Sequence, residues 1–197
     1  MTLKLVIGNK NYSSWSMRPW LALRANNIPF EEIFISLYSG EADKRKLLDF
    51  SRSGKVPVLV DGDVTVWDSL AIIEYIAERF PEKRLWPGHP SHRAHARSIS
   101  AEMHSGFAAL RNECGMNLHR LVGAIELSPE ARANIARIQE IWSECRARYG
   151  QSGPFLFGEF TAVDAMFAPV VHRFRTYAIA VTAEAQRYMD TMMALPA

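Results

Sequence analysis

This sequence has few cysteines and almost no net charge. Only two cysteines, Cys114 and Cys145, occur among 197 residues, too few for the disulfide framework of a small secreted domain and without metal-ligand spacing. We therefore expect free thiols in a reducing cytosol, both inside helical segments. The 23 basic and 21 acidic side chains leave a formal charge of +2. This balance disfavours a nucleic-acid partner, because it offers no strong surface for phosphates.

Long apolar runs are also missing. No run reaches the roughly 20 apolar residues of a membrane-spanning helix, and the chain passes from Met1 to Gly8 without the apolar region of a signal peptide. These absences favour a soluble, cytoplasmic protein with no membrane partner. Apolar residues nevertheless make up 48% of the chain, which is enough for a real core in one domain or two small ones.

The first 80 residues alternate between strand and helix patterns. Apolar and β-branched runs predict strands at 3–7, 31–37, 56–60 and 64–67, the last two joined by the Asp61-Gly62-Asp63 hairpin turn. Apolar residues at helical spacing predict helices between the serines at 13–16 and Ile28, at 41–50 and at 70–79. The resulting order, βαβαββα, indicates an α/β domain at residues 1–80.

Everything after this domain has a helical pattern. Three prolines and a glycine at 81–90 predict a linker between domains. An all-helical domain at 91–197 then follows. Its helices are expected in one long segment from Ser91 to about Gly123, from the Ser128 cap to about Tyr149, after the Thr161 to Asp164 capping box, and at about 183–195.

The junction of the first strand and first helix holds candidate chemistry. Residues 9–23 read NKNYSSWSMRPWLAL. The serines lie where the free N–H groups of a first helical turn and the helix dipole favour an anion. Serine before a helix is also the usual N-cap, so this stretch alone leaves both interpretations open. Pro19 fits the helix if it lies in the first turn.

Four motifs in register resemble the soluble glutathione transferases. Their residues are Ser13-Ser14-Trp15-Ser16-Met17-Arg18, Val56-Pro57, Asp68-Ser69 with the following Leu-Ala-Ile-Ile-Glu-Tyr, and Gly158 to Asp164. The first resembles the Ser-Ser-Cys-Ser-x-Arg signature of the zeta class, which includes maleylacetoacetate isomerases, with Trp15 in place of cysteine. The others resemble the family's Val-Pro, its Gln/Glu-Ser glutathione motif and its helical-domain capping box. The resemblance implies a thioredoxin-like N-terminal domain followed by an all-helical domain, the glutathione transferase fold.

The same resemblance implies how the thiol of glutathione is activated. Ser13 aligns with the catalytic serine, whose hydroxyl stabilises the thiolate, and Ser14 and Trp15 lie beside it in the glutathione site. Ser14 and Ser16 are close enough to compete with Ser13, so the choice of Ser13 rests on the alignment. Tyr12 is a rival at the edge of the substrate pocket, because other classes use a tyrosine hydroxyl.

The remaining glutathione contacts are implied by the other motifs. A cis peptide bond before Pro57 frees the backbone of Val56 to pair with the cysteinyl part of the ligand. Asp68 and Ser69 hold the γ-glutamyl ammonium and carboxylate. Lys55, or one of the lysines and arginine at 44–46, meets the glycyl carboxylate.

The acceptor substrate is expected between the domains. Its pocket residues are His104, Phe107, Arg111 and Asn112. Arg111 is either an ordinary exposed arginine or a cation that holds an acidic substrate or a glutathione carboxylate. Trp67 and Trp142 are expected in the core. His92 and His95 have helical spacing but lack a third ligand, so no metal is expected.

The leading functional hypothesis is a cytoplasmic, homodimeric glutathione S-transferase in detoxification, which activates glutathione as a thiolate for attack on a small electrophile. Two alternatives stay open. One is glutathione-dependent cis–trans isomerisation of a maleyl-type diacid, and the other is a non-catalytic binding module of the same fold. The end of the chain after Leu195-Pro196 leads us to expect that the C-terminal tail that covers the acceptor pocket in this family is short or missing.

Overall fold

The N-terminal half of the protein is built on a mixed four-stranded sheet. The structure, a computed structural model, describes residues 2–38 and 40–196. The strands are β1 (Leu3–Ile7), β2 (Phe30–Phe34), β3 (Val58–Asp61) and β4 (Val64–Trp67), in the order β2-β1-β3-β4. β1 is parallel to β2 and antiparallel to β3, and β3 and β4 form the expected hairpin. This is the thioredoxin-like arrangement.

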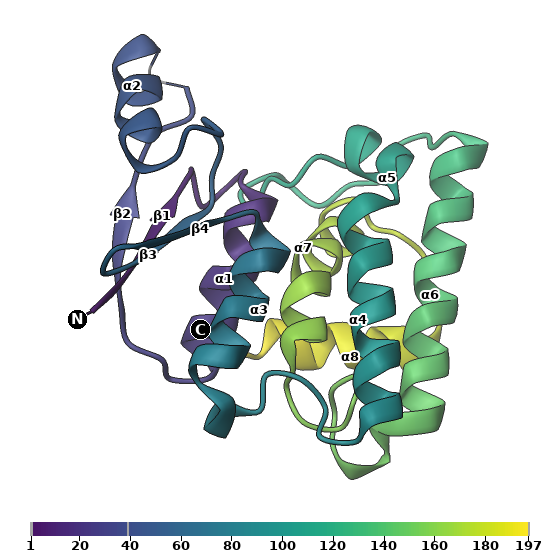
Figure 1. Ribbon diagram of the computed structural model, residues 1–197. Coiled ribbons are helices and arrows are strands. Elements are labelled where there is room, and N and C mark those ends of the chain that lie inside the picture. The colour runs from purple at the N-terminus through teal and green to yellow at the C-terminus, as the bar shows by residue number, and fades with distance from the viewer. Residues whose placement is uncertain (1, 39, 197) are drawn as a thin grey trace.

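Two helices connect this sheet to the rest of the molecule. Figure 1 shows α1 (Ser14–Ala25) and α3 (Ser69–Arg79) side by side between the sheet and the C-terminal helices, while α2 (Glu41–Phe50) stands apart at one end. Leu5, Ile7 and Leu59 of the sheet are fully buried against these helices, as are Leu23 and Ile72. The apolar residues alternate along the strands and recur at helical spacing in α1 and α3. The sheet and these two helices therefore each present an apolar face to the other.

All the regular secondary structure described in the C-terminal half is helical. After a short 3-10 turn at Pro81–Lys83 come α4 (Pro90–Ser105), α5 (Ala108–Glu113), α6 (Pro129–Tyr149), a second 3-10 turn at Gly150–Ser152, α7 (Ala162–Thr176) and α8 (Ala183–Met193). α7 is the central helix, because it is buried almost throughout and packs on α1, α4 and α8. The break between Arg79 and Pro90 agrees with the expected linker, but the domain limits stay a prediction.

The predicted capping box anchors α7. Asp164 Oδ2 accepts hydrogen bonds from the backbone N–H of Thr161 at 2.8 Å and from its hydroxyl at 3.1 Å. Asp164 Oδ1 accepts from the Leu156 N–H and from the hydroxyl of Tyr188, 3.1 Å away. Trp142 is only 1% exposed and packs on Tyr188, so the prediction that it lies in the core is confirmed.

Several local predictions were wrong in their limits. The strand expected at 31–37 ends at Phe34, because its partner β1 ends at Ile7, opposite Phe34. The Leu37 N–H bonds to the side chain of Asn9 instead. The long helix expected from Ser91 to Gly123 stops at Ser105. There Phe107 takes a left-handed conformation, with φ of 59°, and its ring is buried in the core.

Three side chains also differ from expectation. Cys114 follows the last turn of α5 as its C-cap and is not inside a helix. Pro19 lies in the second turn of α1, where it removes the N–H that would bond to the Trp15 carbonyl. Trp67 is 56% exposed on β4, because this strand pairs only with β3 and forms an edge of the sheet.

Candidate active site

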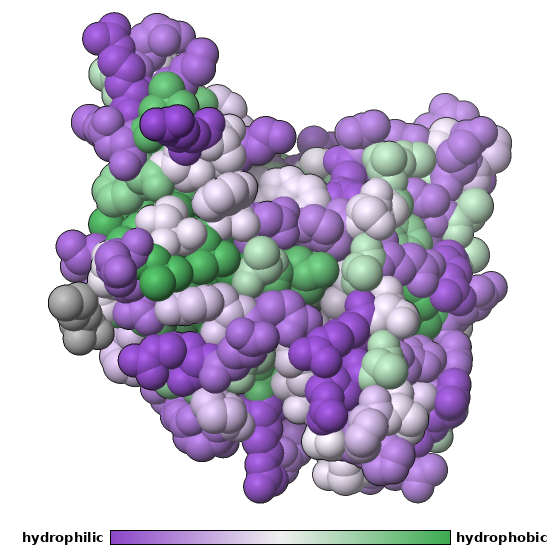
Figure 2. Space-filling model, viewed as in Figure 1, coloured by the Kyte–Doolittle hydropathy of each residue, from purple (hydrophilic) through white to green (hydrophobic). Residues whose placement is uncertain are grey.

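A cavity of about 430 Å³ lies beside the N-terminal turns of α1 and α3. It is lined by Trp15, Ser53, Lys55, Val56, Pro57, Trp67, Asp68, Ser69 and His104. The molecule is visibly hollowed between α2 and α5 in Figure 2. Most residues predicted to bind glutathione therefore meet in one place, together with His104 from the predicted acceptor pocket. We call this space the first cavity.

The loop before β3 forms one wall of the first cavity. The peptide bond between Val56 and Pro57 is cis, as the resemblance implied. Val56 also lies against the end of β1, since a Cβ on Gly8 would come within 3.0 Å of Val56 Cγ2 and 2.7 Å of Leu37 Cδ1. Because Gly8 has no Cβ, the end of β1 can lie in close contact with Val56 of this loop.

The start of α3 forms the opposite wall. Asp68 is the N-cap, with φ of 76°, and its Oδ1 accepts from the Leu70 N–H at 2.9 Å. This positive φ is rare for a residue other than glycine and often marks a functional turn. The Ser69 hydroxyl is only 1% exposed and has no hydrogen-bond partner in the described part of the chain. A ligand in the cavity would supply the missing partner.

His104 joins this wall to the helical half. Its Nε2 lies 3.2 Å from Oδ2 of Asp68. Burial lowers the pKa of His104, and the charges of Arg18 and Arg111 lower it further, whereas Asp68 acts in the opposite direction. The imidazole is therefore mainly neutral at pH 7, and the carboxylate of Asp68 keeps its charge available for a cationic group of a ligand.

Trp15 separates the first cavity from a group of arginines. The guanidinium of Arg18 lies 4.4 Å from the indole centroid, and that of Arg111 lies at 5.0 Å. Arg173 of α7 donates to Ser14 Oγ at 3.4 Å and to the Cys114 carbonyl at 2.7 Å. Arg18 and Arg173 are 0% and 4% exposed, and among the described residues none of the three arginines forms a salt bridge.

These arginines make the N-terminus of α1 electropositive. Burial lowers the pKa of Arg18 to about 9 and that of Arg173 to about 10, and repulsion from Arg111 contributes to both. Both remain cationic at neutral pH. Their hydrogen-bond partners are neutral groups, and the charge of Asp68 offsets only part of that of Arg18. The remaining positive potential favours an anion beside Trp15.

Ser13 lies on the other side of the same turn. Its Oγ accepts from the Ser16 N–H at 3.3 Å and donates to Ser16 Oγ at 2.8 Å. Ser13 does not line the first cavity but a neighbouring one of about 250 Å³, here called the second cavity. The second cavity is lined by Ile7, Gly8, Lys10, Ser13, Ser16, Met17, Trp20, Leu118 and His172.

The other predicted residues lie outside both cavities. Tyr12 is 44% exposed and packs edge-on against Tyr38. Phe107 is in the core, and Arg111 donates to the carbonyls of His104 and Gly106 while it stacks on Trp15. Asn112 is exposed, and of the candidates for the glycyl carboxylate only Lys55 lines the first cavity.

The sequence interpretation missed Ser53, Trp67, Arg18 and Arg173. The spacing of Trp15 and Arg18 places them on one helix face, which was an available signal. Arg173 had none, because it reaches Ser14 from a helix 159 residues further along the chain. Within residues 2–38 and 40–196, no three His, Cys, Asp or Glu side chains gather as metal ligands would. None of the described helices is long and apolar enough to cross a membrane.

Comparison with known proteins identifies the family. Residues 12–79 match the family model "Glutathione S-transferase, N-terminal domain", and residues 128–196 match "Glutathione S-transferase, C-terminal domain". The chain belongs to the glutathione S-transferase family. Both matched segments follow the order of elements described above, and the first includes every glutathione contact predicted in the N-terminal domain.

Named relatives of this glutathione S-transferase family member fall into more than one group. It is 45% identical over 101 residues to a Caenorhabditis elegans protein described as a probable maleylacetoacetate isomerase, a match that covers 51% of this chain and 46% of that protein. It is 28% identical over 179 residues to glutathione S-transferase GstB of Escherichia coli K12, covering 85% and 82%. The match to the first relative thus spans less than half of that relative's length.

Solved glutathione transferases share the fold. A diazinon-metabolizing enzyme from the silkworm Bombyx mori gives a TM-score of 0.75 at 18% identity, with 97% of this chain and 90% of that chain covered. A homologue from Burkholderia with bound glutathione gives 0.71 at 22% identity, with 100% and 93% covered. These likenesses show a common architecture.

Proposed function

We propose that this protein is a glutathione S-transferase that binds glutathione in the first cavity and activates it as a thiolate. The observation that supports this best is the unpartnered, buried hydroxyl of Ser69 beside the carboxylate of Asp68. A carboxylate and a donor at a helix start complement the ammonium and carboxylate of a γ-glutamyl group. Val56 supplies backbone groups for the cysteinyl part, and Lys55 a cation for the glycyl carboxylate.

The chemical step needs an ionised thiol. A free thiol of pKa about 8.5 is only a few per cent thiolate at pH 7. The start of α1, with the positive charges of Arg18, Arg111 and Arg173 behind it, favours the thiolate. Ser13 is the proposed hydroxyl donor, and to act it turns its hydrogen from Ser16 Oγ to the sulfur. The thiol proton leaves to solvent, and the thiolate then forms a carbon–sulfur bond with the electrophile. The electrophile either loses a leaving group with its electron pair or, where the thiolate adds to a multiple bond, takes a proton from solvent.

Calorimetric titration with glutathione is the first test of this function. Saturable binding near one per chain is expected. The absence of heat at millimolar glutathione, from folded protein, would overturn the proposal in favour of a non-catalytic module of the same fold. Turnover of a generic aromatic electrophile, measured next, separates an enzyme from a glutathione-binding module.

The role of Ser13 has its own test. Ser13→Ala should lower turnover about ten- to a hundredfold, since a hydroxyl bond worth up to about two pKa units is lost, with little change in glutathione affinity. Ser14→Ala and Tyr12→Phe are the matched variants at the rival positions. Unchanged turnover of Ser13→Ala, with a loss in one of the others, would transfer the role to that residue.

A second candidate function is glutathione-dependent cis–trans isomerisation of a maleyl-type diacid. The 45% identity to the Caenorhabditis elegans protein described as a probable maleylacetoacetate isomerase favours it. In this reaction the thiolate adds to the double bond and is expelled after rotation, so glutathione is regenerated. Loss of maleylacetoacetate without consumption of glutathione would support it. We also propose a cytoplasmic homodimer, for which light scattering at micromolar concentration should give twice the chain mass.

A further inference from the structure

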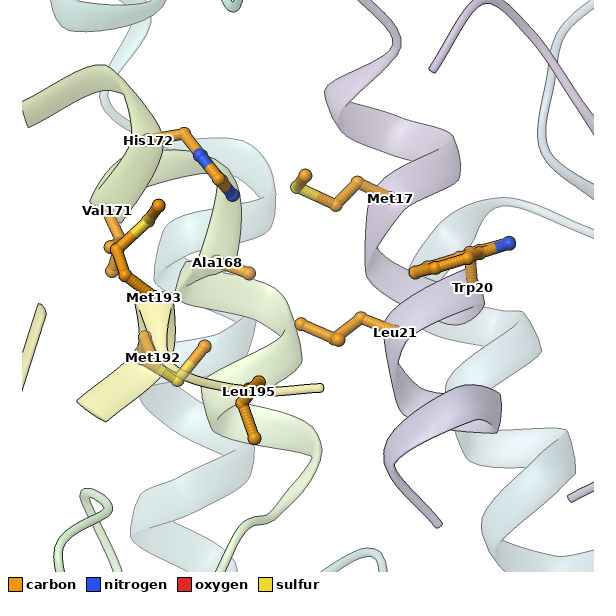
Figure 3. A pocket seen from close by; sticks show the side chains of 9 residues that line it. All are labelled: Met17, Trp20, Leu21, Ala168, Val171, His172, Met192, Met193 and Leu195. Carbon is orange, nitrogen blue, oxygen red and sulfur yellow. The ribbon is translucent and has the colours of Figure 1, made fainter. Parts of the chain in front are cut away.

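The second cavity and a third one form a path along α1. The third cavity, of about 110 Å³, is lined by Met17, Trp20, Leu21, Ala168, Val171, His172, Met192, Met193 and Leu195. It shares Met17, Trp20 and His172 with the second cavity. Figure 3 shows Met17 pointing from α1, and His172 from α7, into the gap between these helices. These shared side chains therefore stand at the junction of the two spaces.

The second cavity, at one end of this path, lies next to the expected position of the glutathione thiol. Ser13 lines the second cavity, and so does Gly8, which adjoins Val56 of the first cavity. A glutathione cysteinyl group paired with Val56 would thus lie at the entrance of the second cavity. An electrophilic carbon placed just inside it would face the sulfur on the side of Ser13.

The walls of the path are formed mainly by apolar side chains, and its polar side chains are Ser13, Ser16, Lys10 and His172. Burial lowers the pKa of His172, and the nearby charge of Arg175 lowers it further, so its ring is neutral at pH 7. Lys10 lies at the rim but pairs with Glu32 at 2.9 Å, and Glu32 also accepts from Trp20 Nε1. Methionine side chains, which are flexible and polarisable, adapt well to the shape of an alkyl chain.

The length of the path is set by α1. Ser13 and Leu21 are eight residues apart on this helix, a rise of roughly 12 Å. At about 30 Å³ for a water-sized group, the third cavity has room for roughly three or four methylene-sized groups. An acceptor that reaches it must therefore pass Met17 with an extended, unbranched tail.

We propose that the acceptor is an electrophile with a linear alkyl tail, that its reactive carbon lies beside Ser13, and that Met17 and the third cavity set the preferred tail length. This inference rests on the proposed glutathione transferase function. The reaction used to test it is the addition of the glutathione thiolate to an n-alkyl isothiocyanate. The sulfur bonds to the central carbon, and the nitrogen takes a proton from solvent, so no leaving group is needed.

The test measures kcat/KM for n-alkyl isothiocyanates from ethyl to decyl, after subtraction of the uncatalysed rate. For the wild type, kcat/KM should rise about three- to fourfold per methylene while the tail becomes buried between apolar side chains. It should then reach a plateau. Met17→Ala, which widens the junction, should move this plateau to tails longer by two or more carbons. Ala168→Phe, which fills the third cavity, should move the plateau to shorter tails.

Met103→Ala is the matched control. Met103 is a fully buried methionine of α4, and it lines none of the three cavities. Its replacement loosens the core without widening the path, so the plateau should stay in place. A chain-length profile that is flat in the wild type, or that shifts equally in Met17→Ala and Met103→Ala, would overturn the proposal. Loss of glutathione binding in the wild type would instead overturn the proposed function itself.

Discussion

His104 Nε2 lies 3.2 Å from Asp68 Oδ2, and this contact connects the last turn of α4 to the first turn of α3. The same carboxylate caps α3 through Oδ1. Asp68 thus has one oxygen committed to the helix and the other shared with a mainly neutral histidine. Among the described residues no lysine or arginine lies within salt-bridge distance of Asp68, which leaves its negative charge available to a ligand ammonium.

Asp68→Asn should weaken glutathione binding about tenfold, because a charge-assisted hydrogen bond is lost. Asparagine is also a good N-cap, so the free energy of unfolding should change by less than about 1 kcal/mol. The pKa of His104 should fall further, since Asp68 raises it. Calorimetry and an NMR titration of the imidazole check these effects. Asp63→Asn, in the exposed hairpin turn, is the control, and equal affinity in both variants would refute the role of Asp68.

Ser69→Ala should reduce glutathione affinity about tenfold without loss of stability. The hydroxyl has no hydrogen-bond partner among the described residues, so its removal relieves an unsatisfied buried group instead of breaking a bond. Ser100→Ala provides a close match, because Ser100 is a buried serine of α4 whose hydroxyl also lacks a partner among the described residues. That variant should bind glutathione normally. If both substitutions weaken binding alike, Ser69 does not contact the ligand.

The pH dependence of stability should carry a contribution from Asp164. Burial raises the pKa of this carboxyl to about 6, above its ordinary value of 3.8. The folded state therefore holds the proton more tightly than the unfolded state, and this contribution is complete below about pH 4 and lost as the pH rises through about 6. This difference of about two in pKa corresponds to about 3 kcal/mol in the free energy of unfolding.

Urea unfolding of the wild type and of Asp164→Asn at several pH values tests this contribution. The free energy of unfolding of the wild type minus that of the variant should fall between pH 4 and pH 6 and stay level above that range. A difference that rises with pH would mean that hydrogen bonds from Thr161, Leu156 and Tyr188 outweigh burial and keep Asp164 ionised.

Neither cysteine should react with a thiol reagent in the native protein at neutral pH. Both are free and buried. Burial raises the pKa of Cys145 to about 12 and also raises that of Cys114, so almost no thiolate is present. A colorimetric assay should detect no thiol within minutes and two per chain after denaturation. Rapid reaction of one thiol in the native state would make it a competitor to glutathione as the nucleophile.

Local features of the fold could be read from the sequence. The hairpin at Asp61 to Val64 and the capping box at Thr161 each depend on a few neighbouring residues whose conformational preferences agree. The cis bond before Pro57, in contrast, was implied only by the family resemblance. The same holds for the gathering of Asp68, Ser69 and Val56, since their motifs lie at the ends of elements that a thioredoxin-like order brings together.

Only the tertiary structure decided where the side chains of α1 point. Ser13 turns toward Ser16 and the second cavity, Ser14 toward Arg173, and Trp15 toward the first cavity, although the three are consecutive. Tertiary packing also decided the position of Phe107, because the free energy gained by burying its ring exceeds the cost of its left-handed backbone conformation. Sequence spacing determines the face of a helix, but the partner on that face comes from a distant segment. Arg173 and His172 of α7 reach α1 only after the two halves of the chain have packed.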